Sequence, residues 1–218
     1  SQQIYTKAEI DPDGIAVGGK ITKIAFKQSN YLTETRNIVV YMQNTDKTLF
    51  TGEKNWAAVA AVDKVFDGEV TLPGTDGSLE ITLNSPIEYT GGNILISIYD
   101  KTNVFGGQAK FYTYSTNAYR ALQTQGTSCN PETMSGSIIT GTQYDRNNSI
   151  DVTFVLPVNE YTGSGNWNDA SNWEEGLPNS NSNVLVSGDL IINSDVTVKT
   201  LVINDGGSVT LESGSLTV

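Results

Sequence analysis

The chain has 218 residues, a formal net charge of −11 and a pI near 4.3. Hydrophobic residues make up 38% of it, which is enough for a packed core and argues against intrinsic disorder. The acidic balance argues against a nucleic-acid partner, and no run of about 18 apolar residues is present to span a membrane. We expect the excess of acidic residues to serve solubility, and calcium binding is the alternative.

The chain contains no histidine and one cysteine, Cys129. Without histidine, Ser-His-Asp and Cys-His catalysis and histidine-bearing zinc sites are excluded. Cys129 lies in a predicted loop and cannot form a disulfide within the chain. The carboxylates are scattered over predicted turns with no marked glycosidase pair, and the Gly-rich pieces lack the strand–loop–helix context of a nucleotide site. We therefore predict a protein that is not an enzyme.

Runs rich in β-branched and aromatic residues, separated by turn sequences, predict strands in the first 156 residues. Leu79–Leu83 alternates apolar and polar residues, which predicts a strand with one wet face. Ile38–Tyr41 and Ile94–Ile98 are apolar at both parities, which predicts central strands covered on both faces. Trp56–Val62 fits either a short helical turn or a strand. The strands are expected at Ile21–Phe26, Asn37–Met42, Val65–Leu72, Leu79–Leu83, Asn93–Tyr99, Lys110–Tyr114, Tyr119–Gln123 and Ile150–Leu156.

The pattern changes after residue 157. Pairs of apolar residues, with one residue between the two members, recur between turn-forming sequences. This pattern is what the short strands of a β-solenoid require, and short hairpins are the alternative. We predict an all-β fold: a jelly-roll-like antiparallel β-sandwich at 1–157, a connector and cap at 158–183, and the start of a β-solenoid at 184–218. Nothing would cover the last strand-like segment, so we expect a piece of a longer protein. The pairs are Val184/Val186, Leu190/Ile192, Val196/Val198, Leu201/Ile203, Val209/Leu211 and Leu216/Val218.

Trp167 and Trp173 lie in the polar run GNWNDASNW, directly before the predicted solenoid. The first coil of a solenoid needs a cap, and a buried indole can supply both apolar area and an N–H donor for an open carbonyl. We therefore predict a structural cap at Trp167 and Trp173. Exposed platforms for sugar rings and contacts to a protein partner are the alternatives.

Two resemblances cover nearly the whole chain. Residues 3–156 resemble a β-sandwich module of secreted and surface proteins of Bacteroidetes, through segments such as GKITKIAFKQ, RNIVVYMQNTDKTLF and LEITLNSPIEYTGGNILISIYD. The tail is similar to the opening of β-solenoid regions in adhesin-like proteins of the same bacteria, whose N-W-x-x-x-x-N-W-x-x-G-x-P pattern runs here from Asn166 to Pro178. The resemblances imply a large, secreted or cell-surface protein, although SQQIYTKAEI shows no signal peptide. They bring no catalytic residues.

Calcium is the metal that the sequence suggests. It requires six to eight oxygen ligands, and the turn DPDG supplies Asp11 and Asp13. Asp100 and Asp145 are the further candidates. No complete EF-hand loop is present, and DPDG is also an ordinary turn sequence, so a turn without a metal is the alternative.

Carbohydrate binding is the other candidate activity. Trp56, Tyr99, Tyr112 and Tyr114 supply rings that could stack on sugars, although such residues on strands also pack in sandwich cores. We expect a non-catalytic module for adhesion or structural presentation, whose partners are other domains of its polypeptide, glycans or host and cell-surface proteins. The alternative is a carbohydrate-binding accessory domain of a secreted polysaccharide-degrading enzyme.

Overall fold

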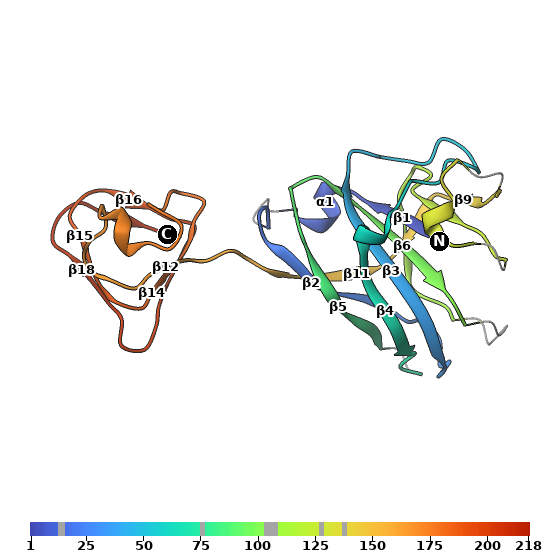
Figure 1. Ribbon diagram of the computed structural model, residues 1–218, viewed down its shortest axis with the longest axis horizontal. Helices are drawn as coiled ribbons and strands as arrows, with labels where there is room; N and C mark the ends of the chain where they lie inside the picture. Colours follow the sequence, from blue (N-terminus) through green and yellow to red (C-terminus); the bar gives the residue numbers. More distant parts are fainter. Residues whose placement is uncertain (13–15, 75–76, 103–108, 127–128, 137–138) are drawn as a thin grey trace. The chain divides into compact units, whose positions relative to one another are not determined.

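The computed structural model describes residues 1–12, 16–74, 77–102, 109–126, 129–136 and 139–218. The chain divides into two compact units, Ser1–Val155 and Leu156–Val218 (Figure 1). Both consist mainly of β-strands joined by turns, with short helical segments between some of them. The predicted all-β class is confirmed, and the larger sheets of the first unit are antiparallel as expected.

A six-stranded antiparallel sheet forms one layer of the first unit. β3 and β6 lie in its interior, where β3 pairs with β4 and β6, and β6 pairs with β3 and β1. These are the two apolar runs for which the sequence predicts central positions. In order across the sheet, the strands are β4 (Lys64–Thr71), β3 (Thr35–Thr45), β6 (Asn93–Asp100), β1 (Gln2–Tyr5), β8 (Ala121–Gln123) and β9 (Thr142–Tyr144).

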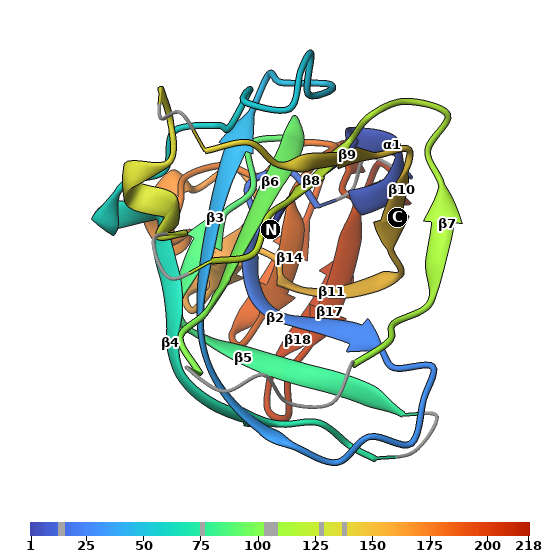
Figure 2. The same ribbon diagram turned by 90° about the vertical axis from the view of Figure 1, so that its right-hand side faces the viewer.

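A three-stranded antiparallel sheet forms the other layer, and Figure 2 shows its strands running across the direction of β3 and β6. A short ribbon completes the strands of the unit. The three-stranded sheet contains β11 (Ile150–Val155), β2 (Lys20–Lys27) and β5 (Ser78–Glu88), and the ribbon contains β10 (Arg146–Asn148) and β7 (Thr113–Ser115). The helical segments are α1 (Lys7–Ile10), η1 (Ala61–Asp63) and η2 (Pro131–Thr133).

Hydrophobic side chains are buried on both faces of the six-stranded sheet. Val39, Tyr41 and Leu95 pack on one face against Phe50 and Trp56, which come from connecting segments. The residues of opposite parity, such as those at 38, 40, 94 and 96, are also buried and point to the other face because side chains alternate along a strand. The double coverage explains why these strands carry apolar residues at consecutive positions.

Each predicted strand of the first unit coincides at least partly with an observed one. Lys110–Tyr114 is the least accurate, because the observed strand is only Thr113–Ser115, preceded by a bridge between Phe111 and Gln28. Neither expectation for Trp56–Val62 is met in full. Residues 56–60 are irregular, and only Ala61–Asp63 forms a 3₁₀ turn, in which the Asp63 carboxylate accepts a hydrogen bond from the Ala60 N–H.

The second unit contains three small parallel sheets, and all of its residues are described. Successive passes of the chain each add one short strand to a sheet, so that two sheets have three strands and the third has two. The sheets are β12 (Asn159–Tyr161), β14 (Asn183–Val186) and β17 (Thr200–Ile203); β13 (Ser164–Asn166), β15 (Asp189–Ile192) and β18 (Ser208–Leu211); and β16 (Val196–Thr197) with β19 (Leu216–Thr217). The 3₁₀ turn η3 (Ala170–Asn172) precedes Trp173.

The six apolar pairs of the sequence form two layers that lie in register. β14, β15 and β16 make the first layer, and β17, β18 and β19 make the second, with Val184 opposite Leu201, Leu190 opposite Val209 and Val196 opposite Leu216. The pairs of the first layer are all buried. In the second layer the second member of each pair is exposed, by 48% at Ile203, 53% at Leu211 and 68% at Val218. The second layer therefore presents an open apolar face.

Candidate functional site

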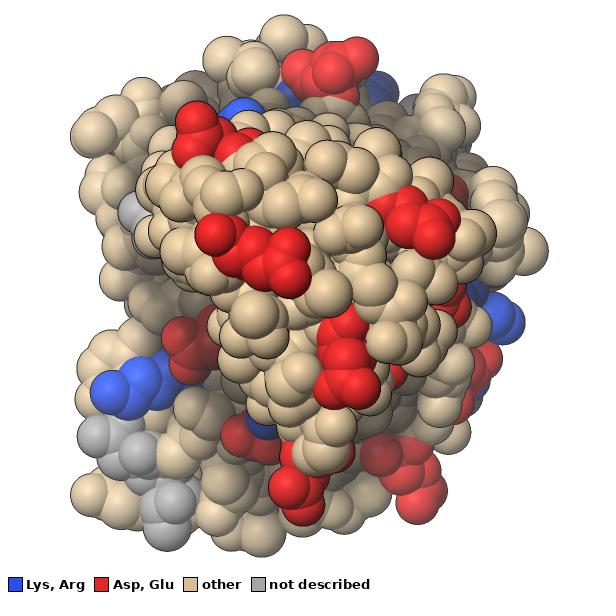
Figure 3. All heavy atoms as spheres, turned by 90° about the vertical axis from the view of Figure 1, so that its left-hand side faces the viewer, with Lys and Arg blue, Asp and Glu red and all other residues tan. Residues whose placement is uncertain are grey.

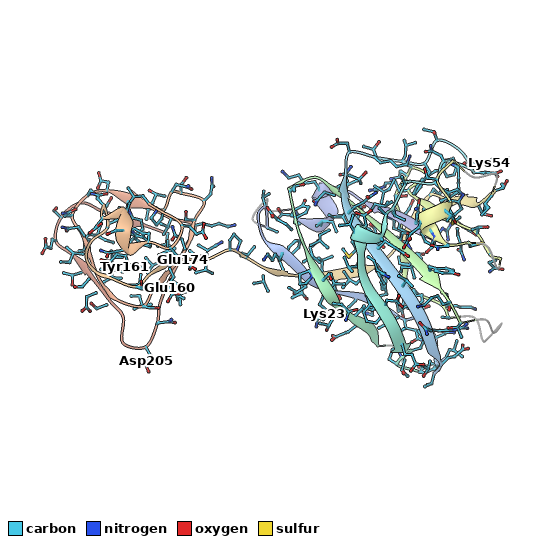
Figure 4. The ribbon with its side chains drawn as sticks, viewed as in Figure 1. Lys23, Lys54, Glu160, Tyr161, Glu174 and Asp205 are labelled. Atoms are coloured by element: carbon cyan, nitrogen blue, oxygen red, sulfur yellow. The ribbon has the colours of Figure 1, made fainter. Side chains whose placement is uncertain are left out.

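Three aromatic side chains, from Tyr161, Trp167 and Trp173, pack against the first layer of the second unit; we call them the aromatic base. Tyr161 ends β12 and lies opposite Val186 of β14 in the parallel register. The Trp173 ring meets both other rings edge to face, with centroid distances of 4.9 Å to Tyr161 and 4.7 Å to Trp167. The three residues are 0, 4 and 5% exposed, and Figure 4 shows Tyr161 inside the unit. Their rings are therefore packed in a core rather than presented to a ligand.

The polar atoms of the aromatic base also have partners. The Trp173 indole N–H donates to the Trp167 carbonyl at 2.8 Å, and the Tyr161 hydroxyl donates to the Gly165 carbonyl at 2.9 Å. Burial raises the pKa of Tyr161, so the hydroxyl stays a neutral donor. The Asp169 carboxylate accepts the N–H of Ser171 at 3.1 Å and starts the 3₁₀ turn that delivers Trp173 to the cluster. The short polar sequence between the two tryptophans is thus a turn that brings the indoles together.

Polar side chains at the corners join successive passes of the chain. In these hydrogen bonds the later residue donates and the earlier residue accepts, except that Asn168 donates to Ser194 at 3.5 Å. The other bonds therefore all run in one direction along the stack. They run from Ser187 to Glu160 (2.5 Å), Asn193 to Asn166 (3.0 Å), Thr200 to Asn183 (3.0 Å), Asn204 to Ser187 (3.0 Å), Ser208 to Asp189 (2.8 Å) and Ser215 to Asp195 (2.8 Å).

Two glycines at one corner allow the backbones of successive passes to approach closely. A Cβ atom at Gly188 would overlap the carbonyl oxygen of Gly163, and one at Gly207 would overlap the carbonyl oxygen of Val186. The neighbouring backbone groups make the interlayer bonds there, from Asp189 N–H to Gly163 at 3.1 Å and from Ser208 N–H to Gly188 at 2.9 Å. Glycine is therefore required sterically at both positions.

The second unit carries most of the net negative charge of the chain. Residues 156–218 contain eight carboxylates and one lysine, a net charge of −7 out of −11. Figure 3 shows the face of this unit that carries β15 and β18, with its acidic side chains set apart among uncharged residues. No group of three or more Asp, Glu, Cys or His side chains that could hold a metal occurs among the described residues of either unit.

Those predicted calcium ligands that the structure describes make contacts with different partners. Asp11 is buried and accepts the Ala16 N–H at 3.1 Å, and Asp100 pairs with Arg36 at 3.4 Å. Asp145 is exposed and lies 3.8 Å from the side chain of Arg146. Asp13 falls outside the described residues. The three described aspartates thus serve separate local contacts.

Two of the predicted sugar-binding aromatics belong to the core of the first unit. Trp56 is 4% exposed, and its indole N–H donates to the Ile139 carbonyl at 2.9 Å. Tyr99 is partly buried and packs against the same hydrophobic cluster. Both side chains therefore pack in or against the core, which is the alternative to sugar stacking given above. No ring face of Trp56 is open to a ligand.

The other two aromatics of that set lie in and beside β7. Tyr112 is 42% exposed, and the Lys27 ammonium lies 5.2 Å from its ring centroid. Tyr114 is partly buried, and burial together with the neighbouring Glu9 carboxylate raises its pKa. Tyr112 and Tyr114 therefore belong to a different part of the unit from the core cluster of Trp56 and Tyr99.

Glu9 is the centre of a polar cluster that the sequence does not reveal. Its carboxylate accepts the Thr6 N–H at 2.7 Å and the Thr6 hydroxyl at 2.9 Å, and Arg120 donates to it at 2.7 Å. Burial acts to raise the pKa of Glu9, but hydrogen bonds from Thr6 and Tyr114 and the charge of Arg120 together lower it. The cluster ties the short helix α1 to the segment before β8, so its role in the described contacts is structural.

A polar cleft opens beside the edge strand β9, with a volume of about 400 Å³. Its walls come from the ends of β8 and β9 and from the loop at residue 53. Sequence reasoning missed this place, because the run TQYDRNN is polar and its pairing with β8 cannot be read from the sequence. The principal lining residues are Glu53, Gln123, Gln125, Thr140, Thr142 and Tyr144.

Comparison of the chain with protein-family models, with curated proteins and with solved structures finds no significant match. None of the helices in the described ranges is both long and apolar enough to cross a membrane.

Proposed function

We propose that the chain is a non-catalytic extracellular module, used for attachment or for structural presentation within a larger bacterial surface or secreted protein. The resemblance to surface modules of Bacteroidetes is the reason for proposing an extracellular location. In this proposal the first unit is a jelly-roll-like sandwich, and the second unit is the beginning of a β-solenoid capped by the aromatic base. Its partners are other domains of the same polypeptide.

The observation that carries the proposal is the parallel, in-register stacking of β14 on β17, β15 on β18 and β16 on β19. Interlayer backbone bonds, apolar columns and corner side chains all repeat from one pass of the chain to the next. Such a stack is stabilised by nearest-neighbour contacts and builds a rigid extension, which suits a spacer or a display surface. The buried aromatic base supports the role of a cap.

Adding one more layer tests the solenoid. A second copy of residues 200–218, joined after Val218, is expected to stack on β17, β18 and β19 because their edges and apolar face repeat the pattern of the layer beneath. Amide hydrogen exchange of Val202 and Thr210 should slow at least about tenfold, since opening would have to break the added layer.

The matched control carries the same added residues in scrambled order, which keeps length and composition but removes the alternation. Equal exchange in the two extended chains, or no slowing in either, would contradict the solenoid interpretation. Incubation of the unextended chain with a panel of polysaccharides and chromogenic glycosides checks the non-catalytic part, for which we expect no product.

A carbohydrate-binding accessory domain is the second candidate. The polar cleft beside β9 favours it, whereas Trp56 and the aromatic base lack the exposure that a stacking platform needs.

A further inference from the structure

The polar cleft is built on the last strand pair of the six-stranded sheet. β8 and β9 pair so that Gln123 lies opposite Thr142 and Ala121 opposite Tyr144. Because side chains alternate along a strand, Gln123, Thr142 and Tyr144 share one face of this pair, and Leu122 points to the other face, into the core. The pairing thus places an amide, a hydroxyl and a phenol ring side by side on the surface.

The floor of the cleft is held in place by buried contacts. A Cβ atom at Gly141 would lie 2.7 Å from the Trp56 ring and 2.9 Å from the Leu122 side chain, so no side chain fits there. The Gly141 N–H donates to the Glu53 carbonyl at 2.7 Å, and the Trp56 indole donates to the Ile139 carbonyl. Gly141 thus lets its backbone pack directly on Trp56 and Leu122, and this contact with the core holds the floor of the cleft in position.

Most of the side chains that line the cleft are available to a ligand, and the exception is Thr124, whose hydroxyl donates to the Thr140 carbonyl at 3.2 Å. Within the described part of the chain, Glu53, Gln123, Gln125, Thr142 and Tyr144 make no side-chain hydrogen bond or ion pair to other protein groups. The Tyr144 residue is 38% exposed. Amides and hydroxyls that both donate and accept, set beside one exposed aromatic ring, can bind the hydroxyls and the apolar face of a sugar at the same time.

The charge and shape of the cleft narrow the class of ligand. The described lining residues include no lysine or arginine, the side chains that most often bind phosphate, sulfate or carboxylate. Lys54, which Figure 4 labels, follows Glu53 in the chain but is not part of the lining. The volume of about 400 Å³ falls in the range of small-ligand sites, and the polar lining argues against a lipid or other apolar ligand.

We propose that this cleft binds a neutral oligosaccharide, with Tyr144 stacking on a sugar ring and Gln123, Gln125 and Glu53 bonding to its hydroxyls. The site is distinct from the aromatic residues for which the sequence suggests sugar binding. It lies in the first unit and is independent of the stacking proposed for the second unit. An experiment that contradicts the sugar-binding cleft therefore does not contradict the stacking of the second unit, and the reverse also holds.

Isothermal titration of the full chain with neutral hexasaccharides tests the proposal, using the cello-, xylo-, manno-, laminari- and chito-oligomers as probes. At least one of them is expected to bind. The Tyr144→Ala variant should weaken that binding at least about tenfold, the loss expected for an aromatic anchor, and Tyr144→Phe should retain most of it. Gln123→Ala should weaken it several-fold.

Tyr31→Ala and Tyr119→Ala are the matched controls, because these tyrosines are 81% and 53% exposed and do not line the cleft. They should bind like the parent chain. The proposal is overturned if no hexasaccharide binds, if Tyr144→Ala binds as tightly as the parent, or if a control loses as much affinity as Tyr144→Ala. Tighter binding of a sulfated oligosaccharide than of any neutral one would also overturn it. Circular dichroism of each variant shows that a loss of binding is not a loss of folding.

Discussion

The indole N–H of Trp173 donates to the backbone carbonyl of Trp167 at 2.8 Å, while the two rings meet edge to face at 4.7 Å. One side chain therefore satisfies a buried carbonyl and fills the space beside the first layer. The contact joins the two tryptophans of the GNWNDASNW segment, and both of their rings belong to the hydrophobic core of the second unit.

Replacing Trp173 should destabilise the second unit in two separable ways. Trp173→Ala removes a buried ring and is expected to lower the free energy of unfolding by about 3–5 kcal/mol. Trp173→Phe keeps an aromatic ring but leaves the Trp167 carbonyl without its donor, for an expected loss of about 1–3 kcal/mol. Urea unfolding monitored by hydrogen exchange in β14 and β15 measures both. A loss below about 0.5 kcal/mol in Trp173→Ala would mean that the ring does not pack as described.

The two layers should respond differently to the same kind of truncation. Ile192 and Leu211 lie opposite each other in the parallel register, but Ile192 is fully buried and Leu211 is 53% exposed. Ile192→Ala is expected to cost about 2–5 kcal/mol, and Leu211→Ala less than about 1 kcal/mol, because an exposed side chain leaves no cavity. Chemical denaturation of the two variants provides the comparison. Equal losses would contradict the assignment of β18 to an open layer.

The corner at Gly188 should not tolerate a side chain. In Gly188→Ala the new methyl group would overlap the Gly163 carbonyl, so the passes of the chain must separate there and the Asp189–Gly163 bond is lost. We expect the second unit to lose at least about 2 kcal/mol of stability. Gly52→Ala is the control, because nothing lies within 4 Å of its Cβ position. A thermal melt in which the two variants behave alike would exclude a steric requirement at Gly188.

Stability at acid pH should depend on Glu9. Its pKa in the folded protein lies below the ordinary value of 4.5, so the ionised form stabilises the fold above about pH 4.5, and this contribution is lost as the pH falls through the lowered pKa. Glu9→Gln should therefore be less stable than the parent at neutral pH, with a difference that shrinks below pH 4.5. Melting temperatures between pH 3 and 7 measure this. Glu80→Gln, which removes an exposed pair with Lys23, should show a smaller change. A difference that stays constant with pH would contradict the role of Glu9.

The sequence predicts strands well where apolar residues dominate, and it misses strands whose burial depends on amides. β1 lies in the interior of the six-stranded sheet, although its sequence QQIY begins with two glutamines. Gln2 is buried because its amide exchanges hydrogen bonds with the backbone of Ala57, at 3.0 and 2.8 Å. Gln3 is buried because it accepts from the Tyr5 hydroxyl and the Asn148 N–H. Ala57 and Asn148 are distant in sequence from β1, so local patterns do not indicate these contacts.

The candidate sites show the same limit. The carboxylates Asp11, Asp100 and Asp145 suggest a metal from their chemistry, yet whether they converge depends on the tertiary fold, and the structure keeps them apart. Tyr144 stands in a polar run, and only its pairing with β8 places it beside Gln123. The apolar pairs of residues 184–218, by contrast, pack mainly on the corresponding pairs of the next pass of the chain. Their spacing in the sequence is therefore enough to predict the observed short strands.

The order of elements in the second unit has a consequence for how it is made. The aromatic base precedes both layers in the chain, and all but one of the corner hydrogen bonds described above run from a later pass to the pass before it. The aromatic base is therefore synthesised first. Each strand of the second layer then pairs with a strand of the first layer that lies only about twenty residues earlier in the chain. Synthesis from the N-terminus and growth of the stack proceed in one direction, so these strands can pair without waiting for the distant part of the polypeptide.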